Sequence, residues 1–233
     1  MAIILLVVGA VMFVSLLFRV SLIQVENNTV YSDEEIIAAS GLEKGVNLFF
    51  INNFTAVSSI YATMPYVEEV NLKRVMPNKV IISVNGSDAV ACVAFGGDYW
   101  LINANGKLLE KIDAKAAESF IRVEHMEPLQ PVAGETLLVS ETDQGKDELL
   151  KKLLSLFEKY GINNHVDYVD LEDINDPVFS YEGRFTVHMM GSGVLERRVV
   201  LAMSAISQLA PGDQGELELD SSDSGTRVYF SPA

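Results

Sequence analysis

The amino-acid sequence predicts an α+β protein that follows a single N-terminal transmembrane helix. Residues 1–18 form an apolar run that contains no charged side chain. Residues 20–88 are then expected to form a strand, two helices and two strands, in that order. Residues 89–233 hold many strand-like segments and two amphipathic helices, which indicates a mixed β-sheet with two packing helices.

The first element, residues 1–19, is expected to remain as a membrane anchor. Eighteen helical residues span about 27 Å, close to a bilayer core of about 30 Å. A cleaved signal peptide is the alternative, but the run lacks a basic start and an A-x-A-like site near its end. A buried soluble helix is a third reading, and it is disfavoured because Ser15 is the one polar interruption. The few charges flanking the run leave its orientation undecided.

The first folded unit, residues 20–88, carries clear local signals. Ser32 and Glu35 have the spacing of a helix capping box, and Gly41 suits the end of that helix. A strand at 22–25 precedes this helix. A second helix is expected at 54–64, capped by Asn53, and two strands follow at 67–74 and 79–84. The apolar face of the second helix is expected to comprise Phe54, Val57, Ile60 and Tyr61.

The second unit, residues 89–233, is expected to form the mixed sheet. Its first helix, 146–160, places leucines and one phenylalanine in helical spacing before Gly161. Its second helix, 194–209, precedes Pro211-Gly212. Asn105-Gly106 predicts a hairpin turn. The expected strands cover residues 89–95, 99–102, 107–112, 121–124, 135–138, 166–171, 178–181, 184–189, 216–219 and 227–230.

Composition excludes some functions. Acidic side chains number 32 against 17 basic ones, for a net charge of −15. An acidic surface repels phosphate backbones, so nucleic-acid binding is disfavoured, and solubility is the simplest role of the charge. The one cysteine, Cys92, permits no intrachain disulfide and is expected to pack as a small hydrophobic side chain.

The sequence offers little catalytic chemistry. His125, His165 and His188 lie far apart and belong to no ligand-spaced motif, so no metal or other cofactor is expected. Gly191-Ser192-Gly193 resembles a nucleophile loop only weakly, and Ser192 is better explained as a helix cap. We therefore expect no catalytic residues and no enzyme activity. An exported, membrane-anchored hydrolase is the rival from another functional class.

Several ordered motifs carry a resemblance to a known family. They are Tyr31-Ser32-Asp33-Glu34-Glu35-Ile36, Gly45-Val46-Asn47-Leu48-Phe49, Pro65-Tyr66-Val67-Glu68-Glu69-Val70 and Pro77-Asn78-Lys79-Val80-Ile81-Ile82-Ser83-Val84. With them, residues 23–93 resemble the POTRA domain of the FtsQ/DivIB cell-division proteins. Tyr99-Trp100-Leu101-Ile102 and the region from Gly191 to Asp220 resemble the β domain of the same family. The resemblance implies three parts, which are a transmembrane helix at 1–19, a POTRA domain at 20–88 and a β domain at 89–233.

The sequence also departs from the family pattern at some positions. Gly86-Ser87 and Ala89 stand where a Glu-Arg pair and a proline are common. Family members usually carry a basic cytoplasmic tail before the membrane helix, and residue 1 here already lies in the apolar run. The tail is therefore either outside this sequence or missing from this member.

The resemblance implies a function in binding. Such proteins belong to the bacterial divisome, sit at the septum with the C-terminal part outside the cytoplasm, and regulate septal peptidoglycan synthesis. They hold FtsL-like and FtsB/DivIC-like bitopic coiled-coil partners, the latter by strand addition near the C-terminus. The matching segment here is Asp223, Ser224, Gly225, Thr226, Arg227, Val228, Tyr229 and Phe230. A POTRA-bearing, membrane-anchored receptor for exported polypeptides is the alternative.

Overall fold

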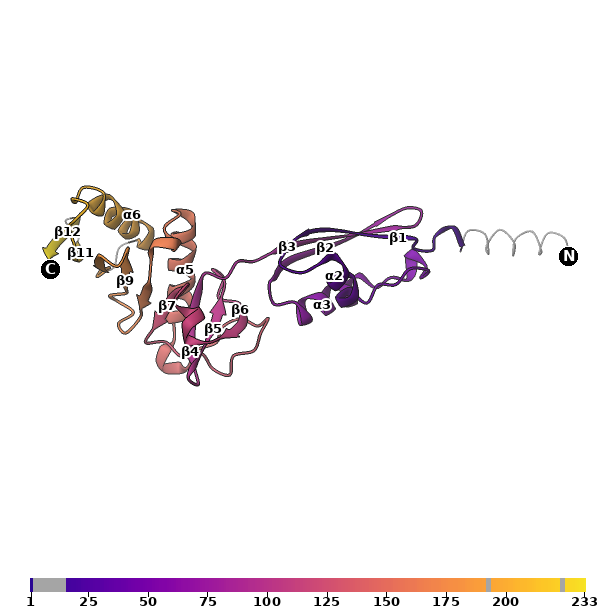
Figure 1. The fold of residues 1–233 in the computed structure, drawn as a ribbon, viewed down its shortest axis with the longest axis horizontal. Helices are drawn as coiled ribbons and strands as arrows, with labels where there is room; N and C mark the ends of the chain where they lie inside the picture. The colour runs from indigo at the N-terminus through magenta and orange to yellow at the C-terminus, as the bar shows by residue number, and fades with distance from the viewer. Residues whose placement is uncertain (2–15, 192–193, 223–224) are drawn as a thin grey trace. The chain divides into compact units, whose positions relative to one another are not determined.

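The computed structural model describes residue 1 and residues 16–191, 194–222 and 225–233. The chain divides into two compact units, Met1–Ser87 and Asp88–Ala233 (Figure 1). Each unit has its own cluster of buried apolar side chains. The α+β class expected from the sequence is confirmed.

Most of the expected transmembrane helix falls in residues 2–15, which lie outside the described residues. Where the structure describes the chain, no helix is both long and apolar enough to cross a bilayer. Leu16 and Leu17 form a short helical stretch, and Arg19 then makes an isolated β-bridge with Asn47.

The first unit has the expected order of elements. Its helices and strands are β1 (Leu22–Asn28), α2 (Asp33–Ser40), the short 3-10 helix η1 (Leu48–Phe50), α3 (Asn53–Thr63), β2 (Val67–Val75) and β3 (Lys79–Gly86). Within the described residues the sheet has three strands in the order β1-β3-β2. The central strand β3 runs parallel to β1 and antiparallel to β2.

Helix α2 begins as the sequence predicts. The Ser32 hydroxyl oxygen accepts from the backbone N–H of Glu35 at 3.3 Å, and the Glu35 carboxylate accepts from the Ser32 N–H at 2.8 Å. These reciprocal bonds satisfy two amide groups that the first helical turn leaves without partners. They also lower the pKa of Glu35. Gly41 ends the helix with a left-handed conformation, at φ 64°.

Helix α3 differs from the expectation in two respects. Its cap is Asn52, whose side-chain oxygen accepts from the amides of Phe54 and Thr55, and it is not Asn53. Asn53 instead donates to the carbonyl of Leu72 and accepts from Arg74. Phe54 is 79% exposed, so the buried face consists of Ala56 and Ile60, with Val57 and Tyr61 packed beside it.

In the described part of the chain, the second unit contains fourteen named elements. They are β4 (Ala91–Phe95), β5 (Asp98–Ile102), β6 (Leu108–Ile112), α4 (Ala114–Ala117), β7 (Ile121–Glu124), η2 (Glu141–Asp143), α5 (Lys146–Lys159), η3 (Asn163–His165), β8 (Tyr168–Asp170), β9 (Val178–Tyr181), β10 (Phe185–His188), α6 (Leu195–Ile206), β11 (Gly215–Ser222) and β12 (Gly225–Pro232).

These strands build one mixed sheet. Across the described residues its order is β12-β11-β10-β9-β8-β7-β4-β5-β6. The pairs β4 with β7, β7 with β8 and β10 with β11 are parallel, and the other neighbours are antiparallel. The last two strands in sequence therefore lie together at one end of the sheet.

Helices α5 and α6 bury their apolar faces in the same core as the sheet. On α5, Leu150, Leu153, Leu154 and Phe157 recur at intervals of three and four residues and are fully buried. Phe157 packs on Phe179 of β9, with ring centroids 5.1 Å apart. The helical spacing read from the sequence thus identifies the packed face of α5 correctly.

One other expectation for this unit is wrong. Residues 135–138 form no strand, because their backbone bonds are divided between two segments. Leu108 N–H donates to the carbonyl of Glu135 and Leu137 N–H to that of Gly106, whereas Leu129 N–H donates to the carbonyl of Leu138. The N-cap of α6 is Val194, which makes no side-chain cap bond. Ser192, which we expected to cap this helix, lies outside the described residues together with Gly193.

We predict that Ser32→Ala destabilises the first unit by about 1 kcal/mol, because the Glu35 amide loses its partner at the start of α2. Ser58→Ala is the matched control, since Ser58 is exposed within α3. Amide hydrogen exchange of α2 in the full chain measures the effect. An equal change in both variants would contradict the role of the cap.

Candidate partner-binding edge

Strand β12 forms one edge of the large sheet. It pairs with β11 along its whole length, from Ser222 opposite Gly225 to Gly215 opposite Pro232. No other described strand lies on its far side. A strand in this position presents a row of main-chain groups that another chain can pair with.

The register shows which main-chain groups face outward. The Gly215 N–H donates to the Arg184 carbonyl on the β10 side at 3.0 Å, so Gly215 does not bond to Pro232 across the ladder. The Ala233 N–H donates to the Gln214 carbonyl at 2.9 Å. Main-chain groups alternate in direction along an antiparallel strand. The alternation directs the amide and carbonyl groups of Val228 and Phe230 away from β11.

The sequence predicted a last strand at 227–230, but the pairing with β11 continues through Pro232. Strand β12 continues through Pro232, because this residue occupies a register position where no N–H is needed toward β11. Gly215 allows the close approach, since a Cβ there would lie 2.1 Å from the Ser231 carbonyl oxygen. On the outer edge, Pro232 offers no donor, so any strand added there would lose its ladder at this residue.

The side chains of β12 point alternately to two faces. Val228 and Phe230 are half-buried against the core, and the Phe230 ring meets Phe185 edge to face at 6.2 Å. Arg227 and Tyr229 are exposed on the other face. Of the eight residues expected at the binding segment, Gly225 and Thr226 also lie in β12, and Asp223 and Ser224 fall outside the described residues.

An acidic row lies beside β12 on the same face as Tyr229. Glu216, Glu218 and Asp220 of β11 are exposed, whereas Leu217 and Leu219 between them are fully buried. The register sets Glu218 opposite Tyr229 and Asp220 opposite Arg227. We did not assign these acids to the site from the sequence, although the strict alternation of acidic residues with leucine was visible there. The row favours basic side chains on any strand that joins this edge.

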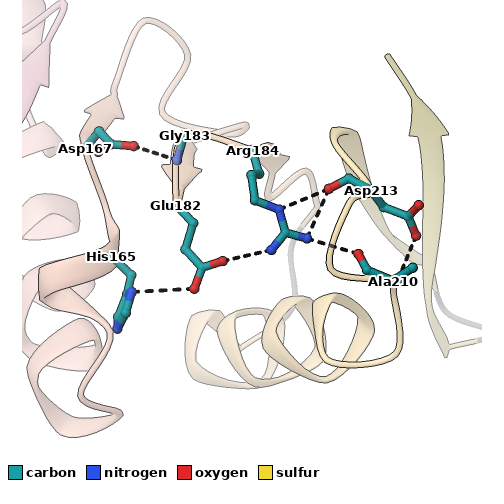
Figure 2. A network of polar contacts seen from close by, with 7 residues as sticks. All are labelled: His165, Asp167, Glu182, Gly183, Arg184, Ala210 and Asp213. Carbon is teal, nitrogen blue, oxygen red and sulfur yellow. Dashed lines mark hydrogen bonds and ion pairs between the residues drawn. The ribbon is translucent and has the colours of Figure 1, made fainter.

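Arg184 holds the start of β11 in place (Figure 2). Its Nε and Nη2 donate to the carbonyl of Asp213 at 3.1 and 3.0 Å, and Nη2 also donates to the carbonyl of Ala210 at 3.2 Å. The Asp213 carboxylate in turn accepts from the Ala210 N–H at 2.7 Å. The guanidinium also lies over the Phe185 ring, 4.6 Å from its centroid. These bonds tie the loop that follows α6 to the start of β10.

The turn before β10 completes this network. Arg184 Nη1 pairs with Glu182 at 3.0 Å, and Glu182 lies 3.5 Å from His165. The Asp167 carboxylate accepts from the Gly183 N–H at 3.0 Å and from the buried Ser180 hydroxyl at 2.9 Å (Figure 2). Glu182 and Gly183 both have positive φ, so these polar contacts stabilise a turn that local preference opposes.

A shallow hollow of about 520 Å³ lies beside Arg184. Its lining is mainly apolar and comprises Tyr160, Ile162, Tyr181, Glu182, Arg184, Val200, Met203, Ile206, Ser207, Leu209 and Pro211. Its polar groups are bonded in different directions: Arg184 pairs with Glu182, the Tyr160 hydroxyl donates to Glu196 and the Ser207 hydroxyl donates to the Ser204 carbonyl. These groups therefore do not converge on a common point as catalytic groups would.

One histidine meets two acids in a way that the sequence spacing did not reveal. Ligand atoms of His125, Asp170 and Glu172 lie within 4.8 Å of one another. Glu124 and Asp170 are register partners on the parallel strands β7 and β8, which brings the residues after each strand together. The Asp170 carboxylate accepts from His125 Nδ1 at 2.7 Å, and this bond is the main reason that the pKa of His125 is raised. His125 and Glu172 are exposed, and Asp170 is partly buried between them.

The groups with nucleophilic potential are held in unreactive states. Burial raises the pKa of the Cys92 thiol to about 11, and its side chain packs in the sheet as expected. The hydrogen bond from Tyr160 to Glu196 raises the pKa of the Tyr160 phenol, while Lys159 shares the same carboxylate at 2.6 Å. An activated nucleophile needs the opposite shift in pKa.

Comparison with known proteins gives a consistent set of relatives. Residues 18–85 match the family model described as POTRA domain, FtsQ-type. The chain is 26% identical over 219 residues to the cell division protein DivIB of Clostridium botulinum (strain Hall), which covers 91% of this chain and 82% of that protein. The chain is therefore similar to the cell division proteins of the FtsQ/DivIB family along most of its length.

Other relatives match this chain over shorter lengths. DivIB of Clostridium tetani is 26% identical over 164 residues, which covers 70% of this chain and 61% of the relative. The cell division protein FtsQ of Syntrophotalea carbinolica is 30% identical over 105 residues, which covers 45% of this chain and 36% of that protein. The names of these relatives support a role in bacterial cell division.

We predict that Arg184→Gln destabilises the second unit by about 2 kcal/mol, because bonds to a charged donor are lost and two carbonyls lose their partner. Arg197→Gln makes the same change of charge at an exposed position of α6 and should stay within about 0.5 kcal/mol of the original protein. Trp100, the only tryptophan, lies in the second unit, so its fluorescence during urea unfolding reports this unit. Equal stabilities of the two variants would contradict the role of Arg184.

Proposed function

We propose that this chain is a bitopic membrane scaffold of the divisome that binds an FtsB/DivIC-like and an FtsL-like coiled-coil partner. Residues 1–19 would anchor it at the septum with both folded units outside the cytoplasm. Through these partners it would help to regulate septal peptidoglycan synthesis. The FtsQ-type POTRA match at residues 18–85 and the division names of the relatives support this proposal.

The open edge of β12 is the observation that carries the proposal. The outward amide and carbonyl groups of Val228 and Phe230 supply a ladder for one short strand. Strand addition takes its affinity from such main-chain bonds and its selectivity from side-chain contacts on both faces. Because Pro232 has no amide, the added strand would be bounded at this end. The FtsB/DivIC-like partner is the proposed source of that strand.

The two faces of the edge set different requirements on the added strand. On one face, the acids Glu216, Glu218 and Asp220 favour lysine or arginine. On the other face, the half-buried ring of Phe230, which packs on the fully buried Phe185, favours an apolar side chain. A partner segment that alternates basic and apolar residues would therefore fit this edge. A random unfolded polypeptide seldom has this alternation, which favours a defined partner over a general receptor for exported chains.

A binding role also agrees with the state of the reactive groups. The buried Cys92 thiol and the bonded Tyr160 phenol both have raised pKa values. Neither group is therefore prepared to act as a nucleophile, which agrees with regulation by binding.

We predict that Val228→Pro weakens binding of the FtsB/DivIC-like partner at least tenfold, or about 1.4 kcal/mol. The substitution removes one outward amide and leaves the ladder with β11 intact, because Val228 directs no main-chain bond toward β11. Calorimetric titration of the full chain in detergent with the partner from the same organism measures the change.

Val228→Thr is the matched control for this experiment. It keeps both the β-branched shape and the amide, so it should bind within about twofold of the original chain. Thermal unfolding of both variants tests whether the sheet remains folded. If Val228→Pro stays folded and binds as tightly as Val228→Thr, the partner does not add a strand at this edge.

A further inference from the structure

Exposed apolar side chains gather at one end of the first unit. We call this the basal surface and define it by Leu22, Val46, Phe49, Phe50, Phe54 and Met76. Phe50 is 84% exposed, Phe54 79% and Met76 69%. Single exposed apolar side chains are ordinary, but a group that includes three phenylalanines marks an interaction surface.

The topology brings these residues to the same end of the unit. Strands β1 and β3 both begin there, β2 ends there, and α3 also begins there. The Ser21 N–H donates to the Asn78 carbonyl at 2.8 Å, which places the β2–β3 turn with Met76 beside the start of β1 (Figure 1). Arg74 donates to the Ile51 carbonyl and to Asn53, which fixes the start of α3 against the end of β2.

This end is also where the chain leaves its apolar run. Phe18 is the last residue of that run, and its carbonyl accepts from the Leu48 N–H at 2.8 Å. Its ring meets Phe49 edge to face, with centroids 5.0 Å apart. Val20 N–H donates to the Val46 carbonyl at 2.9 Å. The basal surface is therefore bonded directly to the residues that follow the proposed membrane anchor.

Charge is distributed along the same axis. The five basic residues of the first unit all lie toward the basal end, and they are Arg19, Lys44, Lys73, Arg74 and Lys79. Of its seven acidic residues, only Glu43 lies there. The other six, Glu26, Asp33, Glu34, Glu35, Glu68 and Glu69, lie toward the end where β1 and β3 finish and β2 begins. In a chain of net charge −15, the basal end is thus locally basic.

We propose that the basal surface rests in the headgroup region of the lipid bilayer, with the rings of Phe49, Phe50 and Phe54 in contact with lipid. This inference rests on the membrane anchor of the proposed function. Aromatic rings favour the membrane interface, and basic side chains beside them favour anionic headgroups. The surface would hold the POTRA unit in a fixed orientation at the membrane. A single flexible attachment without this contact would leave the unit free to rotate.

Lipid-quenched fluorescence tests this proposal on the full chain. The background is Trp100→Phe, which removes the only tryptophan. Phe50→Trp then reports on the basal surface. Val30→Trp is the matched control, because Val30 is 75% exposed and follows β1 at the opposite end of the unit. Both variants are reconstituted in vesicles of phosphatidylcholine and phosphatidylglycerol, with and without acyl chains brominated near the headgroup.

We expect brominated lipid to remove about half of the emission in the Phe50→Trp variant and to leave the Val30→Trp variant unchanged, since interfacial side chains reach only the upper acyl region. Equal quenching of both variants, or no quenching of either, overturns the proposal. The proposal is also overturned if the Phe50→Trp emission shifts to the blue only when an unfolded peptide is added, because the surface would then bind polypeptide.

Flotation separates this inference from the proposed function. If the chain floats with the vesicles after alkaline washing and the Phe50→Trp variant is not quenched, the anchor stands and the basal contact is wrong. If the chain does not float, both the anchor and the basal contact are wrong.

Discussion

The position of the open edge depends on how Arg184 fixes the loop between α6 and β11. Strand β11 must run parallel to β10, so the chain crosses from one end of the sheet to the other through α6 before it can pair. Arg184, at the start of β10, bonds to the carbonyls of Ala210 and Asp213 at the end of that crossing. This sets the register of Phe185 opposite Gly215. The register of β11 then determines which amides of β12 face outward.

The same constraint explains the side chains on either side of the edge. With Gly215 turned toward β10, Leu217 and Leu219 enter the core and the acids between them face solvent. A slip of one residue would bury the acids and expose the leucines. Burial of the leucines therefore opposes any other register of β11. The outward direction of the Val228 and Phe230 main-chain groups thus follows from hydrophobic burial as well as from the bonds made by Arg184.

Much of the fold could be predicted from the sequence because its signals are local. The Ser32 and Glu35 pair, the leucine spacing of α5 and the alternation in β11 each depend on residues a few positions apart. The errors arose where distant contacts decide the outcome. Arg74 and Leu72 engage Asn53, which leaves Asn52 to cap α3, and the backbone bonds of residues 135–138 are divided between two segments, so these residues form no strand.

The candidate site was predictable only in outline. The sequence placed a last strand near residues 227–230, but strand order alone shows that β12 is an edge. The separate roles of Tyr229 and Phe230, one exposed and one packed on Phe185, depend on a register that no local pattern specifies. The meeting of His125 with Asp170 likewise depends on the parallel pairing of β7 with β8.

The central claim is that the β12 edge accepts a strand from the FtsB/DivIC-like partner. Residue-resolved amide exchange of the full chain, with and without that partner, tests it most directly. In the free chain, the amides of Arg227 and Tyr229 should be protected by β11, and those of Val228 and Phe230 should exchange quickly. The account predicts that the partner slows exchange at Val228 and Phe230 at least tenfold while Arg227 and Tyr229 change little. Binding of the partner with no added protection at Val228 and Phe230 would contradict it.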